Sequence, residues 1–437
     1  MLFCGIDIGT TNLKVGLVDE SARVVWLRSV PTPRLAPDTY LAVDGKALVS
    51  LIERVIIEGW SQVGKGAPLA AIATTGVGED GVLVDEELRP VSFAIPWFDR
   101  GATEEADFIR ASNAETPKAG IEMDPTRTGA RWLWYRRHYP EIVRPAHCWI
   151  ALTDLPAAVF AGRPFISETL AARTGCFDVA GRSWIAELLQ ATGAPRLPAA
   201  LRASEIVGPV VSPALIESGA AGDRTLVIAG GHDHPVAASY IQRLDRAARV
   251  DSIGTANVVY GETSDTRLDR FDPEIAFTVP ILAKRGLACL GVFEFSAAVR
   301  ALEKRGVDIR SILALTRLPG EPGDKSDARA IFEMASFAAL RMLERMDMAG
   351  VPRGPIFATG GWSRSRGLLE LRASIFGEPV YILDEQEPAV AGAALIGAQG
   401  GGNMVEIRQA GTRECVEPDA VWISRYREFA AVKAAAR

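Results

Sequence analysis

One short pattern occurs twice in this chain, once near the start of each half, and any fold must accommodate both copies. The copies are Asp7–Ile8–Gly9–Thr10–Thr11–Asn12 and Asp251–Ser252–Ile253–Gly254–Thr255–Ala256–Asn257. In each, apolar residues flank an Ile-Gly-Thr turn, which predicts a strand, a tight turn and a second strand. The backbone N–H groups of such a turn form a concave site for an anion. Two unrelated β-hairpins would give the same pattern, whereas two hairpins that face one cleft would hold the two ends of a polyphosphate.

Length and composition narrow the class of protein. A chain of 437 residues exceeds what one hydrophobic core usually supports, so we expect two domains. The net charge of −6 argues against a nucleic-acid partner. The five cysteines form no CxxC pair, the start of the chain lacks the basic region of a signal peptide, and no apolar run is long enough to span a bilayer. These features predict a soluble enzyme with reduced thiols, located in the cytoplasm and without a membrane partner.

The stretch from Thr225 to Pro235, near the middle of the chain, reads TLVIAGGHDHP. Four apolar or β-branched residues precede two glycines, which predicts a buried strand that ends in a tight turn, and Pro235 suits the first turn of a following helix. A carboxylate at the carboxyl end of a strand, such as Asp233, is typical of a catalytic site in α/β proteins; a helix N-cap is the structural alternative. His232 and His234 lack further ligands at metal-binding spacing, so we expect them to orient this carboxylate or to line a pocket.

Two segments of the first half are suited to bind a sugar. Glu79 and Asp80 lie in Gly76–Gly81, which formally matches the GxGxxG dinucleotide fingerprint. A predicted strand follows instead of a helix, which argues against a nicotinamide or flavin site, and the two carboxylates suit hydroxyl groups. Trp97–Phe98–Asp99–Arg100 combines a ring, a carboxylate and a guanidinium, which suits the apolar face and the hydroxyls of a sugar. An exposed ion pair beside a core tryptophan is the alternative for this second segment.

Three later segments suggest a nucleotide site and the packing around it. The double glycine Gly360–Gly361 follows a predicted strand and would let backbone approach a flat ligand, although an ordinary glycine turn has the same sequence. The small-residue helix around Gly392 either packs tightly against a neighbour or lies under a nucleotide. The periodicity of residues 328–346 predicts a helix whose buried stripe consists of Ile331, Met334, Ala335, Ala338, Met342 and Met346.

Taken together, these segments resemble the FGGY family of carbohydrate kinases, within the actin-like, hexokinase-like ATPase superfamily. The resemblance covers nearly the whole chain, and six modest motifs in the right order are highly specific. They are Asp7–Lys14, similar to the first phosphate loop, Trp97–Arg100, similar to the sugar segment, Gly230–Asp233, similar to the segment of the catalytic aspartate, Ile253–Thr255, similar to the second phosphate loop, Thr359–Ser365, similar to the adenosine segment, and Glu387–Ala394, similar to the closing helix. Two departures are Trp362, where many relatives carry a third glycine, and the short, charged segment 295–331, whose nucleotide contacts cannot be carried over.

The resemblance implies an α/β fold of two actin-like ATPase (ribonuclease H-like) domains, each with a mixed sheet flanked by helices, around a central cleft. We place the boundary near Gln242–Arg243, which gives a sugar-binding domain with the catalytic aspartate at 1–242 and an adenosine-binding domain at 243–437. The implied reaction moves the γ-phosphoryl group of MgATP to a sugar hydroxyl, with Asp233 as general base and Asp7 holding Mg²⁺ through water. The implied ATP-binding residues are Thr10, Thr11, Asn12, Lys14, Gly254, Thr255, Gly360, Gly361 and Gly392, and the implied sugar-binding residues are Glu79, Asp80, Trp97, Asp99, Arg100 and His232.

The hydroxyl-binding wall favours a ketopentose, a tetrulose or a polyol over a sugar acid, although Arg100 would suit a carboxylate. Two other function classes stay open: a catalytically inactive sugar-binding or regulatory protein of the same fold, and a nicotinamide-dependent oxidoreductase based on Gly76–Gly81. The positions implied in phosphoryl transfer all carry chemically competent residues, and no helix-turn-helix segment is evident at either terminus, which favours the kinase. The expected partner is a small sugar or polyol, and a homodimer stays an option.

Overall fold

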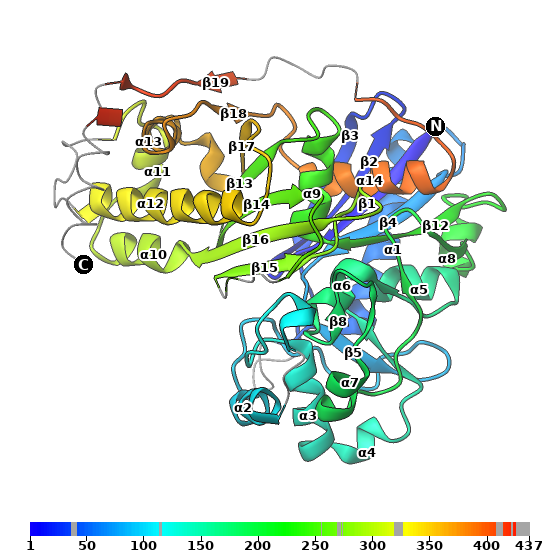
Figure 1. Ribbon diagram of the computed structural model, residues 1–437. Coiled ribbons are helices and arrows are strands. Elements are labelled where there is room, and N and C mark those ends of the chain that lie inside the picture. The colour runs from blue at the N-terminus through cyan, green and yellow to red at the C-terminus, as the bar shows by residue number, and fades with distance from the viewer. Residues whose placement is uncertain are drawn as a thin grey trace.

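The computed structural model describes residues 1–35, 42–112, 116–254, 256–268, 272, 274–318, 327–407, 414–420 and 423–424. Within these residues, two mixed β-sheets form the main body, and a smaller lobe projects below them in Figure 1. The first sheet has the strand order β11 (Ile206–Pro209), β12 (Leu226–His232), β4 (Ala71–Gly76), β1 (Leu2–Ile8), β2 (Asn12–Asp19) and β3 (Val24–Pro31).

The second sheet repeats this topology. Its order is β19 (Glu414–Val416), β18 (Val380–Ile382), β17 (Ile356–Thr359), β13 (Arg249–Ile253), β14 (Ala256–Thr263), β16 (Leu287–Glu294) and β15 (Ile275–Thr278). In both sheets a central antiparallel hairpin, β1–β2 or β13–β14, has a parallel strand beside its first member, β4 or β17. The repeated sequence pattern therefore does form two equivalent hairpins, and the prediction of two mixed sheets flanked by helices is confirmed.

Each turn of the repeated pattern closes on itself. The N–H of Gly9 donates to the carbonyl of Asn12 at 3.1 Å, and the N–H of Gly254 donates to the carbonyl of Ala256 at 3.1 Å. A Cβ on Gly9 would lie 2.7 Å from the Asn12 carbonyl oxygen, so this tight turn needs glycine.

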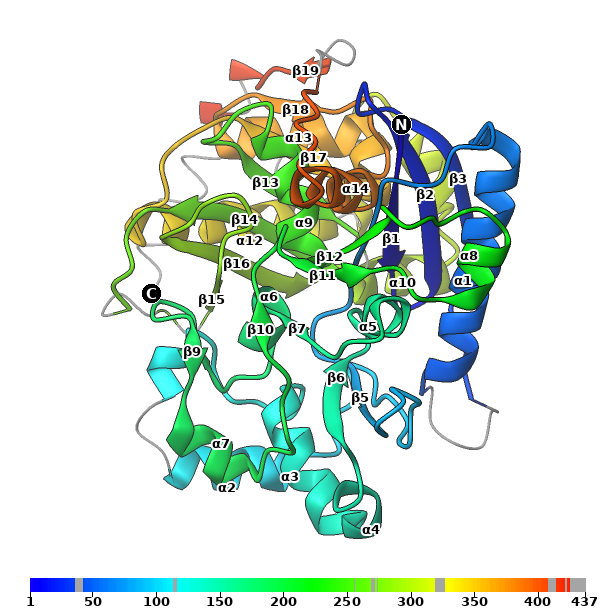
Figure 2. The same cartoon turned by 90° about the vertical axis from the view of Figure 1, so that its right-hand side faces the viewer.

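Two helices, α9 (Asp233–Gln242) and α14 (Pro388–Gly400), pack together between the two sheets (Figure 2). Their small residues permit unusually close backbone approach. A Cβ on Gly392 would lie only 2.4 Å from the carbonyl oxygen of Val236 on α9, and one on Gly5 of β1 would lie 2.0 Å from the carbonyl oxygen of Val390. Because α9 follows directly on β12, this packing sets the position of Asp233, the first residue of α9. The tight turn predicted between strand and helix is absent: β12 extends through both glycines to His232.

The remaining helices of the main body cover the outer faces of the sheets. They are α1 (Gly45–Val63), α5 (Leu155–Ala161) and α8 (Pro213–Glu217) near the first sheet, and α10 (Ser296–Lys304), α11 (Ile309–Leu313), α12 (Asp327–Met348), the 3₁₀ turn η2 (Gly361–Arg364) and α13 (Arg366–Phe376) near the second. The predicted stripe of α12 is partly correct: Ala335, Met342 and Met346 are buried, Ile331 and Ala338 are half-buried, and Met334 is 69% exposed. Phe332, Ala339 and Leu343 complete the buried face, and Met342 and Met346 lie against β16 and β14.

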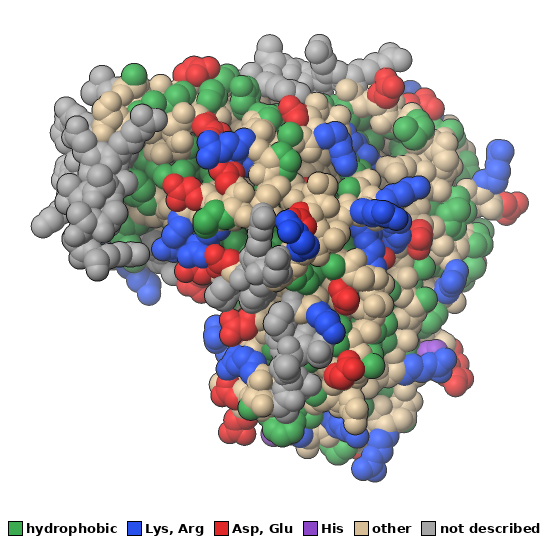
Figure 3. All heavy atoms as spheres, in the orientation of Figure 1, with side chains coloured by type: hydrophobic (Ala, Val, Ile, Leu, Met, Phe, Trp, Pro, Cys, Tyr) green, Lys and Arg blue, Asp and Glu red, His purple; other side chains and the backbone are tan. Residues whose placement is uncertain are grey.

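The smaller lobe is built from short elements between β5 and β11. They are β5 (Gly81–Val84), α2 (Thr103–Ser112), η1 (Thr116–Ala119), α3 (Thr128–His138), α4 (Pro140–Val143), β6 (Cys148–Ala151), β7 (Ile166–Ser167), α6 (Glu168–Arg173), β8 (Phe177–Asp178), β9 (Ser183–Trp184), α7 (Ala186–Thr192) and β10 (Ala200–Leu201). All five cysteines are free thiols. In the part of the chain that the structure describes, none of the helices is both long enough and apolar enough to cross a bilayer. On the face in Figure 3, acidic and basic side chains are interspersed over both the main body and the lobe.

Candidate active site

A cavity of about 340 Å³ lies between the two sheets and collects residues from both halves of the chain. The first half contributes Asp7, Lys14, Asp233, His234 and Ala237; the second contributes Ser252, Ala358, Thr359, Gly360, Gly361, Ser363, Arg364, Leu383, Glu385, Gln386, Glu387, Pro388 and Ala389. Five predicted site residues therefore share one cavity: Asp7, Lys14, Asp233, Gly360 and Gly361.

Asp233 is held by one of its two carboxylate oxygens. Its Oδ1 accepts a hydrogen bond of 2.7 Å from the backbone N–H of His234 and lies 3.2 Å from Nε2 of His232 and 3.8 Å from Nε2 of His234. Burial lowers the pKa of His232 to about 3, so its ring is neutral at pH 7. Within the described residues, all of these contacts use Oδ1, which leaves Oδ2 for a ligand.

Asp7 and Lys14 face the same cavity from the first hairpin. Burial and, to a smaller extent, the neighbouring Asp233 raise the pKa of Asp7 to about 7, although Lys14 opposes the shift. Lys14 Nζ lies 2.6 Å from Oε2 of Glu387, the residue that precedes α14. The lining of the cavity thus combines four carboxylates, those of Asp7, Asp233, Glu385 and Glu387, with the cationic side chains of Lys14 and Arg364.

The first turn is supported from outside the cavity. Thr32 Oγ1 donates to the carbonyl of Gly9 at 2.8 Å, and Arg34 donates to the carbonyl of Thr10. Trp97 Nε1 donates to Thr10 Oγ1 at 2.9 Å, so the tryptophan predicted to stack on a sugar also contacts the predicted phosphate loop. Thr11 and Asn12, next in this turn, are exposed.

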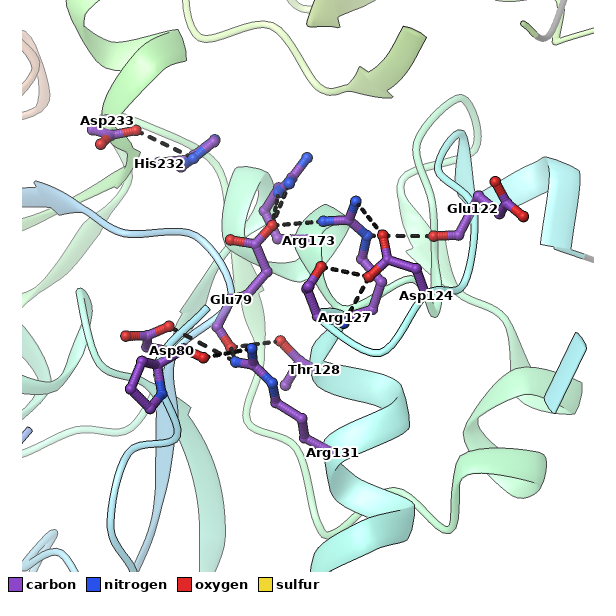
Figure 4. Close-up of polar contacts among 12 residues, drawn as sticks. Glu79, Asp80, Glu122, Asp124, Arg127, Thr128, Arg131, Arg173, His232 and Asp233 are labelled. Atoms are coloured by element: carbon purple, nitrogen blue, oxygen red, sulfur yellow. Dashed lines mark hydrogen bonds and ion pairs between the residues drawn. The ribbon is translucent and has the colours of Figure 1, made fainter. Parts of the chain in front are cut away.

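Glu79 lies at the centre of a buried cluster of charges (Figure 4). Its Oε1 accepts a hydrogen bond of 2.7 Å from Arg127 Nη1, one of 2.9 Å from Arg173 Nε and a further one from Arg173 Nη2. Burial alone would raise the pKa of Glu79, but Arg173 and Arg127 outweigh it and hold the pKa below its usual range. Figure 4 shows the other oxygen directed away from the arginines, toward the side on which His232 and Asp233 lie.

Asp80 belongs to the same wall but has weaker partners. Arg131 Nη1 lies 3.8 Å from its Oδ1, which has no hydrogen bond within the described residues. Burial raises the pKa of Asp80 to about 7, and Arg131 opposes this shift. Arg131 also donates to the carbonyls of Ile95 and Pro96, and so fixes the segment that carries Trp97.

None of the other predicted site residues that the structure describes lines the large cavity. Asp99 lines a separate cavity of about 170 Å³ together with Phe93, Arg131 and Trp134, and Arg100 is exposed. Gly392 lies in the contact of α14 with α9 instead of on the cavity wall, because its missing Cβ is what lets the two helices approach. Gly254 is half-buried at the second turn, outside the cavity lining, and Thr255 lies outside the described residues.

Trp362, which stands where many relatives have a third glycine, does not place its ring in the large cavity. It packs against Phe295 and Phe332, with ring centroids 5.5 and 5.2 Å away, under α10 and α12. The neighbouring Gly361 and Ser363 line the cavity, and Trp362 itself does not. Residues 319–326, at the centre of the short charged segment, lie outside the described residues.

Arg127 and Arg173 were not singled out from the sequence, although both hold Glu79. Arg127 and Arg131 are spaced by four residues near the start of α3, a spacing that places both on one helix face and could have indicated a shared carboxylate partner. Arg173 offers no local signal, because its partner Glu79 is 94 residues away in the chain.

Comparison with known proteins identifies the family of the chain. Residues 2–239 match the model of the FGGY family of carbohydrate kinases, N-terminal domain, and residues 304–400 match its C-terminal domain. The chain is 24% identical to a xylulose kinase of Escherichia coli (strain K12) over 424 residues, which are 86% of this chain and 85% of that protein. It is also 24% identical to an L-fuculokinase of the same strain over 441 residues, 91% of this chain and 92% of that one.

The fold is likewise shared with solved structures. A crystal structure of a xylulose kinase from Brucella ovis superposes with a TM-score of 0.88 at 21% identity, and the match covers 98% of this chain and 97% of that one. The two family models together span most of the chain; the first hairpin lies within the N-terminal model, and the second hairpin lies between the two matched segments. The chain therefore belongs to the FGGY family of carbohydrate kinases, which makes it a sugar kinase, a phosphotransferase with a carbohydrate alcohol group as acceptor.

Proposed function

We propose that this kinase transfers the γ-phosphoryl group of MgATP to a hydroxyl of a small neutral sugar, a ketopentose, a tetrulose or a polyol, with Asp233 as general base. The observation that carries the proposal is the position of Asp233, which lies in one cavity with Asp7, Lys14 and the Gly360–Gly361 backbone. A carboxylate that is anchored through one oxygen and open at the other can accept the proton of an incoming hydroxyl.

A neutral acceptor is supported by the charge balance of the wall around Glu79. Arg173 and Arg127 are both engaged by Glu79, Arg127 also lies 3.0 Å from Asp124, and Arg131 faces Asp80. Each of the three arginines of this cluster thus has a carboxyl group within 3.8 Å. The open oxygen of the ionised Glu79 would accept a hydrogen bond from a sugar hydroxyl and would repel a substrate carboxylate.

His232 and Arg173 supply further polar atoms to this wall. His232 Nδ1 and Arg173 Nη1 are buried and have no hydrogen-bond partner within the described residues. An unpaired buried polar atom is costly, and a ligand that satisfied both would gain accordingly. Hydroxyl groups can both donate and accept, so a polyol fits this pair of atoms.

The donor set around Asp7 fits Mg²⁺. Within the described chain, no group of three or more His, Cys, Asp or Glu side chains is arranged to hold a metal by itself. Mg²⁺ usually keeps several waters and binds through one or two carboxylates and substrate phosphates, so Asp7 and the nucleotide would suffice. When bound, the ion neutralises charge on the phosphates. Burial and the nearby carboxylate of Asp233 raise the pKa of Asp7, and a bound cation would oppose both effects.

The other assignments rest on the family resemblance of the motifs. Thr10, Thr11, Asn12 and Lys14 would hold the phosphates from one side, Gly254 and Thr255 from the other, and Gly360 with Gly361 would lie against the adenosine. We propose the same two-domain division as before, 1–242 and 243–437, with closure of the domains excluding water as a competing acceptor. A dinucleotide site at Gly76–Gly81 has no support, because β5 and not a helix follows this segment.

The test is ADP release from MgATP over a panel in which each ketose or polyol is paired with the sugar acid of the same carbon chain. We expect one neutral sugar to drive turnover at least 100-fold faster than its acid. A preference for the acid would refute the neutral substrate class. If no compound drives turnover and sugars still raise the melting temperature, the protein is an inactive sugar-binding member of the family.

A further inference from the structure

Three buried polar residues of the second sheet form a network directly behind the second turn. Asp251 lies on β13, Asn257 on β14 and Arg372 on α13, and none of the three is accessible to solvent. Arg372 Nη2 donates to Asn257 Oδ1 at 2.5 Å, Asn257 Nδ2 donates to Asp251 Oδ1 at 2.6 Å, and Arg372 Nη1 lies 3.4 Å from Asp251 Oδ2. The network therefore joins one helix to both strands of the hairpin.

The register of the hairpin explains why these side chains meet. Ile253 pairs with Asn257 as the last pair before the turn, and Asp251 lies two residues before Ile253. Residues two apart on a strand and residues paired across strands share one face of a sheet. Ser252, whose side chain belongs to the other face, lines the large cavity. The network thus contacts the face of the hairpin that is turned away from the large cavity, and Ser252 on the opposite face lines that cavity.

The other end of the network leads to a different wall of the same cavity. α13 begins two residues after η2, whose Gly361 and Ser363 line the cavity. At Gly360, just before η2, a Cβ would lie 2.7 Å from the carbonyl oxygen of Ile253. The second turn and the adenosine segment are therefore in contact at the backbone and are linked again through Arg372.

The network is poorly suited to a purely stabilising role. Arg372 Nε and Nη1 and Asp251 Oδ2 have no hydrogen-bond partner within the described residues. Burying two charges is expensive, and a buried ion pair is often no better for stability than apolar residues of similar volume. The pair of Arg372 and Asp251 can instead fix the position of α13 relative to the hairpin β13–β14.

We propose that Arg372 is a positioning residue for the nucleotide: it holds the hairpin β13–β14, whose Ser252 lines the large cavity, against the adenosine segment. This inference rests on the proposed role of the large cavity as the nucleotide site. Arg372 touches no ligand in it; it acts through Asn257 and Asp251.

The chain offers a matched control in Arg249, the first residue of β13 and so at the opposite end of the same strand. Arg249 is 2% exposed and is held by the carbonyl of Gly354 at 3.0 Å and by Glu378 Oε2 at 2.6 Å. R249M removes a buried guanidinium from the start of β13, whereas R372M removes a buried guanidinium of α13 that contacts β13 and β14 near the cavity.

The experiment measures the KM for ATP, the KM for the sugar and the Kd of ADP without sugar for both variants. We expect R372M to raise the KM for ATP and the Kd of ADP at least tenfold while the sugar KM changes less than twofold. R249M should lower the melting temperature by a similar amount and leave both nucleotide constants within twofold. Unchanged nucleotide constants in R372M, or equal increases in both variants, would overturn the proposal.

A second variant covers the case in which R372M fails to fold because Asp251 is left unpaired. The double variant R372M/D251N removes both charges and is expected to fold but to keep the tenfold weaker nucleotide binding; wild-type nucleotide binding in it would refute the positioning role. Failure of the proposed function is distinguishable, because the wild-type protein would then bind no ADP in the first place.

Discussion

Two glycines of α14 should respond in opposite directions to the same substitution. Alanine in the interior of a helix is favoured over glycine by roughly 0.5–1 kcal/mol. At Gly397 the new Cβ would meet the Ala71 Cβ at 3.4 Å, so G397A should gain most of this amount. At Gly392 the new Cβ would lie 2.4 Å from the backbone carbonyl oxygen of Val236, which cannot rotate away.

Relief of the contact at Gly392 requires α14 and α9 to separate by close to an ångström. Overpacking of this kind costs typically about 1–3 kcal/mol, which exceeds the gain in helix propensity. We therefore expect G392A to lower the free energy of unfolding by about 1–2 kcal/mol, while G397A raises it by about 0.5 kcal/mol. Because α9 begins at Asp233, kcat should fall with stability in G392A.

The assay is equilibrium unfolding in urea, with the midpoint compared at constant m-value. If G392A is as stable as G397A, the close packing of the two helices is wrong. If G392A keeps its stability and kcat but raises the KM for ATP, Gly392 contacts the nucleotide, as the sequence resemblance implied, and the packing role assigned to it here fails.

Three further substitutions probe the site. The pKa of Asp7 is raised to about 7, so this carboxyl group holds its proton more tightly in the folded than in the unfolded state, and its ionisation lowers stability as the pH rises from about 4 to 7. The D7N variant should therefore have a higher melting temperature than wild type at pH 8, and this difference should shrink toward pH 5. D7N should also lose turnover. E79Q should raise the sugar KM at least tenfold at unchanged ATP KM and lower the free energy of unfolding by about 3 kcal/mol, because two arginines lose their carboxylate; a change confined to the ATP KM would contradict this. W97F removes the hydrogen bond to Thr10 Oγ1 and should raise both KM values in steady-state kinetics, whereas an effect on the sugar alone would show that the bond carries no coupling.

Much of the fold could be predicted because local patterns and packing agree. The Ile-Gly-Thr turns predicted two hairpins, and both occur at the centres of sheets with the same strand order. Met334 was wrongly placed in the buried stripe of α12, because Met334 and Phe332 are both apolar and only the position of the sheet decides which of them is buried. Similarly, the two glycines before His232 suggested a turn. In the structure Gly230 lies within β12, where a Cβ would lie 1.9 Å from the carbonyl oxygen of Thr74 on the neighbouring strand, so this contact and not a turn requires the glycine.

The candidate site was predicted less completely, for a physical reason. Asp7, Lys14 and Asp233 belong to strand ends, whose place in a sheet follows from local pattern, and they do share one cavity. Arg173 and Glu79 meet across the interior of the lobe, and no periodicity in either segment encodes that contact. Asp99 and Arg100 were predicted to bind the sugar together with Trp97 because the three lie in one short segment. The chain turns after Trp97, and the carboxylate of Asp99 instead accepts a hydrogen bond of 2.7 Å from the N–H of Gly101.

The most direct test of Asp233 as the general base of phosphoryl transfer compares kcat of D233N with that of wild type at saturating concentrations of MgATP and of the best sugar of the panel. The asparagine keeps the size of the side chain but cannot accept the hydroxyl proton, so we expect kcat to fall by about 10²–10⁴-fold. The Kd of ADP should change less than threefold. A D233N enzyme that retains more than a tenth of the wild-type kcat would contradict the role of Asp233 as general base.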